Sequence, residues 1–121
     1  MAQTHTQQDF EGVFSHERLD VYRIALRFTR WAWPASQRLP VGRSAVRDQL
    51  MRASEGVVLN IAEGAQQVSP QMARKHYRIA LASAAECAAG LDLLEVYRVQ
   101  GVDEGRQLVN RIGAMLRKMV R

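Results

Sequence analysis

The three prolines of this 121-residue chain constrain its fold most, because each falls between stretches of helical periodicity. Proline lacks a backbone N–H donor and restricts the residue before it, so it marks the end or the start of a helix. Pro34 and Pro40 bracket one break, and Ser69-Pro70 has the pattern of an N-cap followed by proline at the first helical position. With Gly64 and Gly101 interpreted as helix ends, four helices are predicted, over residues 17–33, 44–63, 70–100 and 103–120.

The predicted helices carry apolar residues at alternating spacings of three and four, which indicates one face turned to a shared core. No stretch alternates as a strand would, and the short connections favour antiparallel neighbours. We therefore predict an all-α, antiparallel up-and-down four-helix bundle over residues 17–121. A polar leader over residues 1–16, whose composition is compatible with disorder, precedes it. The expected core positions are Val21, Ile24, Phe28 and Trp31, then Val46, Leu50, Ala53, Val57, Ile61 and Gly64, and finally Leu108, Ile112, Met115 and Met119.

A second apolar set lies off these faces. Four helices of this length bury one broad stripe each, so we expect the excess to form subunit contacts in a homo-oligomer. The alternative is that it thickens the core of a single chain. Trp31 and Trp33 lie about 200° apart around a helix, which predicts Trp31 in the core and Trp33 at an interface or near the bundle end. The set comprises Tyr22, Leu26, Trp33, Met51, Val58, Ala62, Val109, Leu116 and Val120.

The net charge of +5 is distributed unevenly along the chain. Most of the 17 basic residues lie in three acid-free stretches, from Val21 to Arg47, from Gly64 to Ala85, and beyond Glu104. Such segregation predicts a positive face for phosphates or for an acidic protein, although charged helix faces are often merely solvated. Cations near the last helix end are expected from the helix dipole alone, namely Arg111, Arg117, Lys118 and Arg121. The candidate nucleic-acid contacts are Arg23, Arg27, Arg30, Arg43, Arg47, Arg74, Lys75 and Arg78.

A polar seam runs beside the apolar face of the second predicted helix. It consists of Gln49, Arg52, Asn60 and Glu63, opposite Ser83 on the small-residue face of the third helix. Because buried polar atoms without partners are costly, we expect Asn60 and Glu63 to bond to Ser83 or to backbone groups. The seam would then fix helix register, and a ligand-binding role is the alternative.

The residues of the polar seam and their neighbours also form a pattern that is similar to that of a known protein family. The chain reads Gln-Leu-Met-Arg-Ala-Ser from Gln49 and Asn-Ile-Ala-Glu-Gly from Asn60, with Tyr77, Ser83 and Glu86 following. This pattern resembles the four-helix bundle protein family encoded by intervening sequences of bacterial 23S ribosomal RNA genes. The resemblance covers roughly Phe14 to Leu94. Relatives usually carry Ser-Ile-Pro where this chain has Gly-Val-Val from Gly56, so its second helix should be less kinked.

The resemblance implies an antiparallel four-helix bundle that assembles into a ring-shaped homopentamer with a basic surface. Similar proteins include the accessory variability protein of diversity-generating retroelements, which partners a reverse transcriptase and binds nucleic acid. The family brings no catalytic residues that could be transferred to this chain.

Enzymatic chemistry is not expected from the residues either. His76 and Ser83 are separated by about 10 Å of helix rise, too far for a base and its nucleophile. Cys87 is the single cysteine, and no metal-ligand spacing or phosphate-binding glycine loop occurs. We therefore expect no catalytic residue, no metal and no cofactor.

The absence of a signal-peptide pattern and of a long apolar run predicts a cytoplasmic protein without membrane association. The preferred hypothesis is a non-enzymatic oligomeric binding protein, an RNA-binding accessory factor that uses a basic surface. Its expected partners are further copies of itself, RNA or another nucleic acid, and a protein such as a reverse transcriptase. The alternatives are a scaffold for an acidic protein and a structural domain without nucleic-acid binding.

Overall fold

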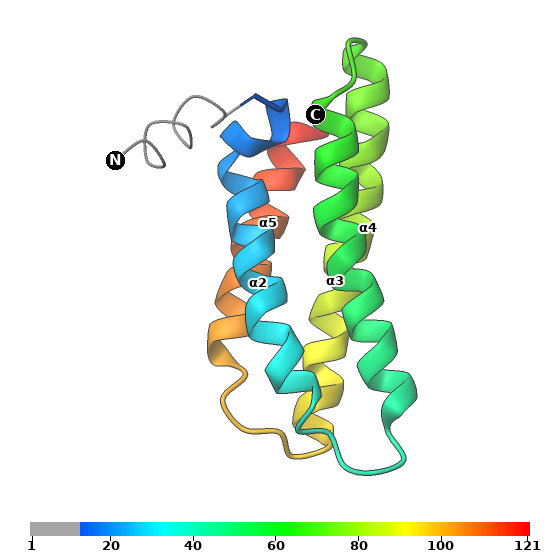
Figure 1. The fold of residues 1–121 in the computed structure, drawn as a ribbon, viewed down its shortest axis with the longest axis vertical. Coiled ribbons are helices and arrows are strands. Elements are labelled where there is room, and N and C mark those ends of the chain that lie inside the picture. The colour runs from blue at the N-terminus through cyan, green and yellow to red at the C-terminus, as the bar shows by residue number, and fades with distance from the viewer. Residues whose placement is uncertain (1–12) are drawn as a thin grey trace, which may run out of the picture.

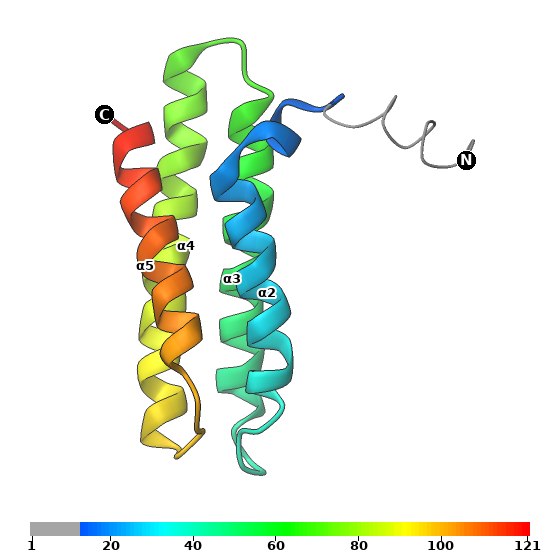
Figure 2. The same cartoon turned by 90° about the vertical axis from the view of Figure 1, so that its left-hand side faces the viewer.

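The computed structural model describes residues 13–121 as four long helices preceded by a short 3-10 helix (Figure 1). Helices α2 and α4 run in one direction and α3 and α5 in the other, which confirms the predicted antiparallel bundle (Figures 1 and 2). Each of α2 and α4 packs against both α3 and α5, so α2 and α4 are diagonal to each other. The elements are η1 (Ser15–Arg18), α2 (Asp20–Ser36), α3 (Ser44–Ala65), α4 (Pro70–Val96) and α5 (Asp103–Met119).

Residues 1–12 of the predicted leader (residues 1–16) lie outside the described residues. The last two residues of the leader, Ser15 and His16, begin η1. Among residues 13–121, no helix is both long and apolar enough to cross a membrane.

Several predicted helix bounds were wrong. The first long helix begins at Asp20 and not at residue 17, because Ser15–Arg18 form η1. Helix α2 continues through Pro34 to Ser36, because proline in the last turn removes only one backbone bond. The Ser36 hydroxyl donates to the Trp33 carbonyl at 2.8 Å and supports this turn. Helix α4 ends at Val96, four residues before the predicted end. Arg98 adopts the left-handed conformation (φ 65°) just after it, and Gly101 has a positive φ (75°) in the loop, away from the helix end that the prediction gave it.

Gly64 is not the end of α3, which continues to Ala65. It is helical and buried, and a Cβ built on it would lie 2.6 Å from Cε1 of Tyr77. Glycine is therefore required here by the close approach of the α4 ring and not by a left-handed backbone.

The core lies where the periodicity placed it on α3, with Leu50, Val57 and Ile61 almost fully buried. Phe28 and Ile112 are equally buried, whereas Trp31, Val46, Met115 and Met119 are only partly covered. Val109 and Leu116 were expected at subunit contacts and instead lie in the core. Because α5 packs against both α2 and α4, it buries a wider face than one narrow stripe.

A hydroxyl pair that the sequence analysis missed joins α2 to α3 inside the bundle. Thr29 Oγ1 and Ser54 Oγ lie 2.6 Å apart, and Ser54 is 1% exposed. Thr29 also donates to the Ala25 carbonyl at 3.1 Å, so Ser54 donates to Thr29. Both hydroxyls are satisfied without water, which removes the cost of burying them.

The glycines of α5 provide a test of this packing. In Gly105→Ala the new methyl group would collide with the Trp31 ring, whereas at Gly113 a Cβ would meet nothing within 4 Å. We expect Gly105→Ala to lower the free energy of unfolding by about 1–2 kcal/mol, because overpacking outweighs the gain in helix propensity. The matched Gly113→Ala variant should be neutral or more stable. Urea denaturation of both variants measures the difference, and equal effects would contradict the close packing of Trp31.

Candidate nucleic-acid interface

The first candidate group lies along the exposed side of α2. Arg23, Arg27 and Arg30 are spaced by four and three residues, so they share one helix face. Arg23 lies 3.6 Å from Asp20 and donates to the Glu17 carbonyl at 3.0 Å. Within residues 13–121, neither Arg27 nor Arg30 has an ion-pair partner. Their charges are therefore available to an external anion.

Helix α5 extends this group across the surface. Arg27 and Arg30 line a pocket of about 330 Å³ together with Trp31 and with Glu104, from the first turn of α5. Arg111 is exposed and follows Glu104 by seven residues, close to two turns, so it lies on the same side of α5. The adjacent helices α2 and α5, seen in Figure 2, thus carry a basic strip made of Arg23, Arg27, Arg30 and Arg111.

The attribution of Arg111 to the end of the last helix was wrong. It lies eight residues before Met119, more than two turns inside α5, where the dipole effect has decayed. Arg111 was not among the predicted nucleic-acid contacts, because the helix dipole alone was used to explain this residue. The spacing from Glu104 would have suggested its side, but not that this side adjoins α2.

A second group gathers at the end of the bundle that carries the C-terminus. Arg74, Lys75 and Arg78 lie in the first turns of α4, and Arg78 approaches the Val120 carbonyl at 3.5 Å. This contact joins them to the basic C-terminal end of the chain, where α5 carries Arg117 and Lys118 and Arg121 follows it.

A third group lies at the opposite end, where the α2–α3 and α4–α5 loops meet (Figure 1). Arg43 places its guanidinium 4.8 Å from the centre of the Tyr97 ring, and Arg47 pairs with Asp48 at 3.3 Å. Arg38 donates to the Gln100 carbonyl at 3.0 Å. These arginines have intramolecular contacts that account for their positions. The eight candidate residues are therefore distributed over three separate surfaces of one chain.

The polar seam contributes little to any of these surfaces. The Gln49 amide donates to Glu86 at 3.4 Å across the α3–α4 interface. Asn60 donates to the Gly56 carbonyl of its own helix at 2.9 Å. Of the two predicted partners, Ser83 or a backbone group, Asn60 therefore bonds to the backbone. Arg52 and Glu63 are exposed to solvent. Ser83 instead packs against Gly56, where a Cβ would lie 2.9 Å from its hydroxyl oxygen.

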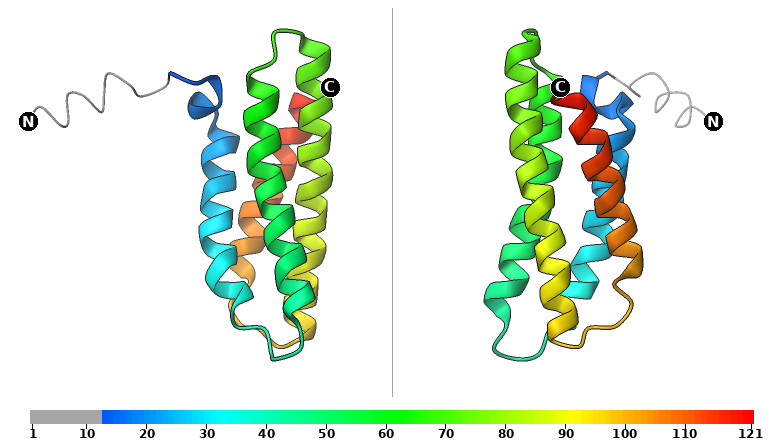
Figure 3. Two further views of the ribbon diagram at one scale, coloured as in Figure 1. Left: turned by 45° about the vertical axis from the view of Figure 1, so that its right-hand side comes forward. Right: turned by 180° about the vertical axis from the view of Figure 1, so that it is seen from behind.

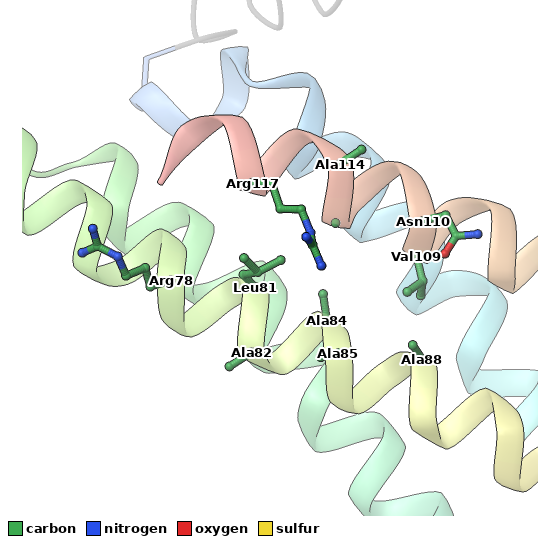
Figure 4. A pocket seen from close by; sticks show the side chains of 11 residues that line it. Arg78, Leu81, Ala82, Ala84, Ala85, Ala88, Val109, Asn110, Ala114 and Arg117 are labelled. Atoms are coloured by element: carbon green, nitrogen blue, oxygen red, sulfur yellow. The ribbon is translucent and has the colours of Figure 1, made fainter. Parts of the chain in front are cut away.

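A different surface lies between α4 and α5, which face the viewer in the right-hand view of Figure 3. It is an open groove of about 760 Å³ whose floor is built largely of alanines, with Leu81 and Val109 as its larger apolar residues. Figure 4 shows Arg117 reaching from α5 toward Ala84 on α4. Arg78 lies at one end, so an apolar trough is bordered by cations.

With this geometry established, comparison with known proteins identifies the lineage. Residues 17–121 match the family model described as 23S rRNA-intervening sequence protein. The chain belongs to the 23S rRNA-intervening sequence protein family. The match includes all four long helices and therefore extends the resemblance noted in the sequence to the last helix. No curated protein matches the chain in sequence.

The 23S rRNA-intervening sequence proteins are small helical proteins with no known catalytic activity. In this member, burial and then the neighbouring Glu86 carboxylate raise the pKa of the Cys87 thiol to about 12. The thiol is therefore protonated at neutral pH and is not a nucleophile. Within residues 13–121, no group of three His, Cys, Asp or Glu side chains could hold a metal ion.

The charge of one further arginine is neutralised within the fold. Arg106 bonds to Glu95 and to Asp92 at 2.8 Å. The hydrogen bonds that Arg106 donates, first to Glu95 and then to Asp92, raise the pKa of this guanidinium. Arg106 thus ties α5 to α4 and is not part of the basic strip.

The protonated state of Cys87 leads to a measurable expectation. At pH 8.5 the folded protein should react with a disulfide reagent about three orders of magnitude more slowly than an ordinary thiol, because thiolate is the reacting form. In denaturant the rate should return to that of a free cysteine. Rapid labelling of the native chain would show that Cys87 is neither buried nor protonated as described.

Proposed function

We propose that this 23S rRNA-intervening sequence protein is a non-enzymatic, oligomeric accessory factor that binds RNA on a basic surface. The observation that carries the proposal is the basic strip of Arg23, Arg27, Arg30 and Arg111. Two of its members, Arg27 and Arg30, are exposed and have no acidic partner in the described part of the chain. A guanidinium binds phosphate through charge-assisted and often bidentate bonds.

Each chain carries three separate basic surfaces. Self-association would place the basic surfaces of several chains next to one another. The outer face of α4 supports it, because Met72, Ile79, Leu93 and Val96 are each at least 40% exposed. With Ala82 and Ala89 they recur at spacings of three, four and seven residues along one side of α4, which no other helix among residues 13–121 covers. The proposed assembly is the homopentameric ring that the resemblance implies, with a protein such as a reverse transcriptase as a further partner.

The second candidate function is a scaffold for an acidic protein. The groove between α4 and α5 favours it, because an apolar trough bordered by Arg78 and Arg117 suits an amphipathic helix with acidic flanks. The proteins that copurify with the chain distinguish the candidates, since a scaffold retains its partner after nuclease treatment. The RNA-binding proposal remains first because Arg27 and Arg30 are exposed and have no acidic partner among residues 13–121.

The salt dependence of RNA binding tests the first proposal. For the wild-type chain, fluorescence anisotropy with single-stranded RNA should show an affinity that falls steeply with salt, because each phosphate contact releases counterions. Arg27→Gln and Arg30→Gln should each lower the slope of log K against log salt by about 0.7. A wild-type affinity that stays constant between low and moderate salt would overturn the proposal.

Arg52→Gln is the matched control for these variants. It removes the same charge from an exposed position of α3, on a face that also carries Asp48 and Glu55. Its salt slope should equal that of the wild type. A loss equal to that of Arg30→Gln would indicate that net charge, and not the basic strip, drives binding.

Self-association has its own test. Ile79→Glu with Leu93→Glu places two charges on exposed positions of α4, so the fold should persist while the subunits separate. Light scattering should report the mass of an oligomer for the wild type and of a monomer for the variant. Ala45→Glu, at an exposed position near the start of α3, should leave the oligomer intact. A monomeric wild type at micromolar concentration would refute the assembly.

A further inference from the structure

We infer that the pocket between α2 and α5 receives a single unpaired nucleotide, with guanine as the preferred base. In this arrangement the base lies against Trp31, its phosphates bind Arg27 and Arg30, and its hydrogen-bonding edge meets Glu104. The inference rests on the proposed RNA binding and identifies what that binding recognises.

The pocket is an open hollow with the size of a small-ligand site. Its volume is about 330 Å³, near the lower end of the range for such sites. Its walls are two arginines, one tryptophan and one glutamate, from two helices of opposite direction. One aromatic surface, two cations and one anion therefore meet in a space that a mononucleotide fits.

Trp31 supplies a fixed aromatic surface. Its six-membered ring packs against Gly105, which has no side chain to displace it, and its centroid lies 5.8 Å from that of Phe28. Trp31 as a whole is only partly buried and lines the pocket. The contacts with Gly105 and Phe28 fix the ring before a base packs on it, so little entropy is lost when the base binds.

Arg27 and Arg30 supply the contacts to the backbone of the nucleic acid. They are three residues apart on α2, so their side chains leave the helix on the same side. Glu104 lines the same pocket, yet neither arginine lies within ion-pair distance of it or of any other carboxylate among residues 13–121. Both guanidinium groups thus keep their full donor capacity for phosphate oxygens.

Glu104 determines which base fits. An ionised carboxylate only accepts hydrogen bonds, and its two oxygens match two adjacent N–H donors. Guanine presents such a pair, N1–H and the N2 amino group, on the edge that an unpaired base exposes. Uracil offers one N–H between two carbonyl oxygens, which the carboxylate repels. A duplex would have this edge occupied, so the pocket requires a single strand.

The two tryptophans of the chain allow a direct test, because Trp33 is 57% exposed near the end of α2 and can be replaced without disturbing the core. Trp33→Phe leaves Trp31 as the only tryptophan, and Trp31→Phe leaves only Trp33. With excitation at 295 nm, the RNA pentamer UUGUU should quench the fluorescence of Trp33→Phe and leave that of Trp31→Phe unchanged. Circular dichroism melts of both variants verify that they are folded.

The base preference is measured separately by anisotropy. The wild-type chain should bind UUGUU about tenfold more tightly than UUUUU, and Glu104→Gln should bind the two with nearly equal affinity. Asp103→Asn, the adjacent exposed acid, should keep the preference.

The outcomes separate this inference from the proposed function. Salt-dependent RNA binding without quenching of Trp31, or without a preference that depends on Glu104, would overturn the pocket and leave RNA binding in place. Absence of any RNA binding would overturn both. Quenching of Trp31 together with loss of the preference in Glu104→Gln supports both.

Discussion

The close approach of α3 and α4 is the constraint on which the rest of the bundle depends. Glycines allow it at three levels, where Gly56 faces Ser83, Gly64 faces Tyr77 and Gly90 faces Leu50. At each level an added Cβ would lie within 3 Å of the partner side chain. Dispersion forces and burial increase as the backbones approach. The α3–α4 interface is the most extensive one between helices in the described part of the chain.

The close packing of α3 against α4 determines which apolar and basic residues remain on the surface. The buried side of α4 combines small residues such as Ala80, Ala84 and Gly90 with the fully buried Leu91 and Leu94, whereas Ile79, Leu93 and Val96 lie exposed on its outer side. The diagonal arrangement then separates the arginines of α2 from those of α4. A single chain therefore presents several modest basic surfaces, and a larger one requires more than one subunit. The pocket beside Trp31 differs because α2 and α5 complete it within one chain.

The hydrophobic pattern predicted much of the fold correctly. The strict spacing from Leu50 to Ile61 identified a buried face, and Ser69 with Pro70 located the start of α4. The helix ends were less predictable. Pro34 was given too much weight because one missing hydrogen bond in a last turn costs little, and Gly64 was interpreted through its backbone freedom when its missing side chain was the reason. The candidate site was predicted only as a set of charges, without the partners that neutralise some of them.

The sequence by itself determined the helices, their buried faces and the excess of positive charge, because these depend on spacing along one chain. It also carried enough of the family pattern to place the protein among its relatives. Only the tertiary structure decided which charges remain available. Arg106 is neutralised by Glu95 and Asp92 across two helices, whereas Arg27 and Arg30 meet Trp31 and Glu104 in a pocket. Such proximity depends on how helices distant in sequence are placed side by side, and periodicity along a single helix carries no information about it.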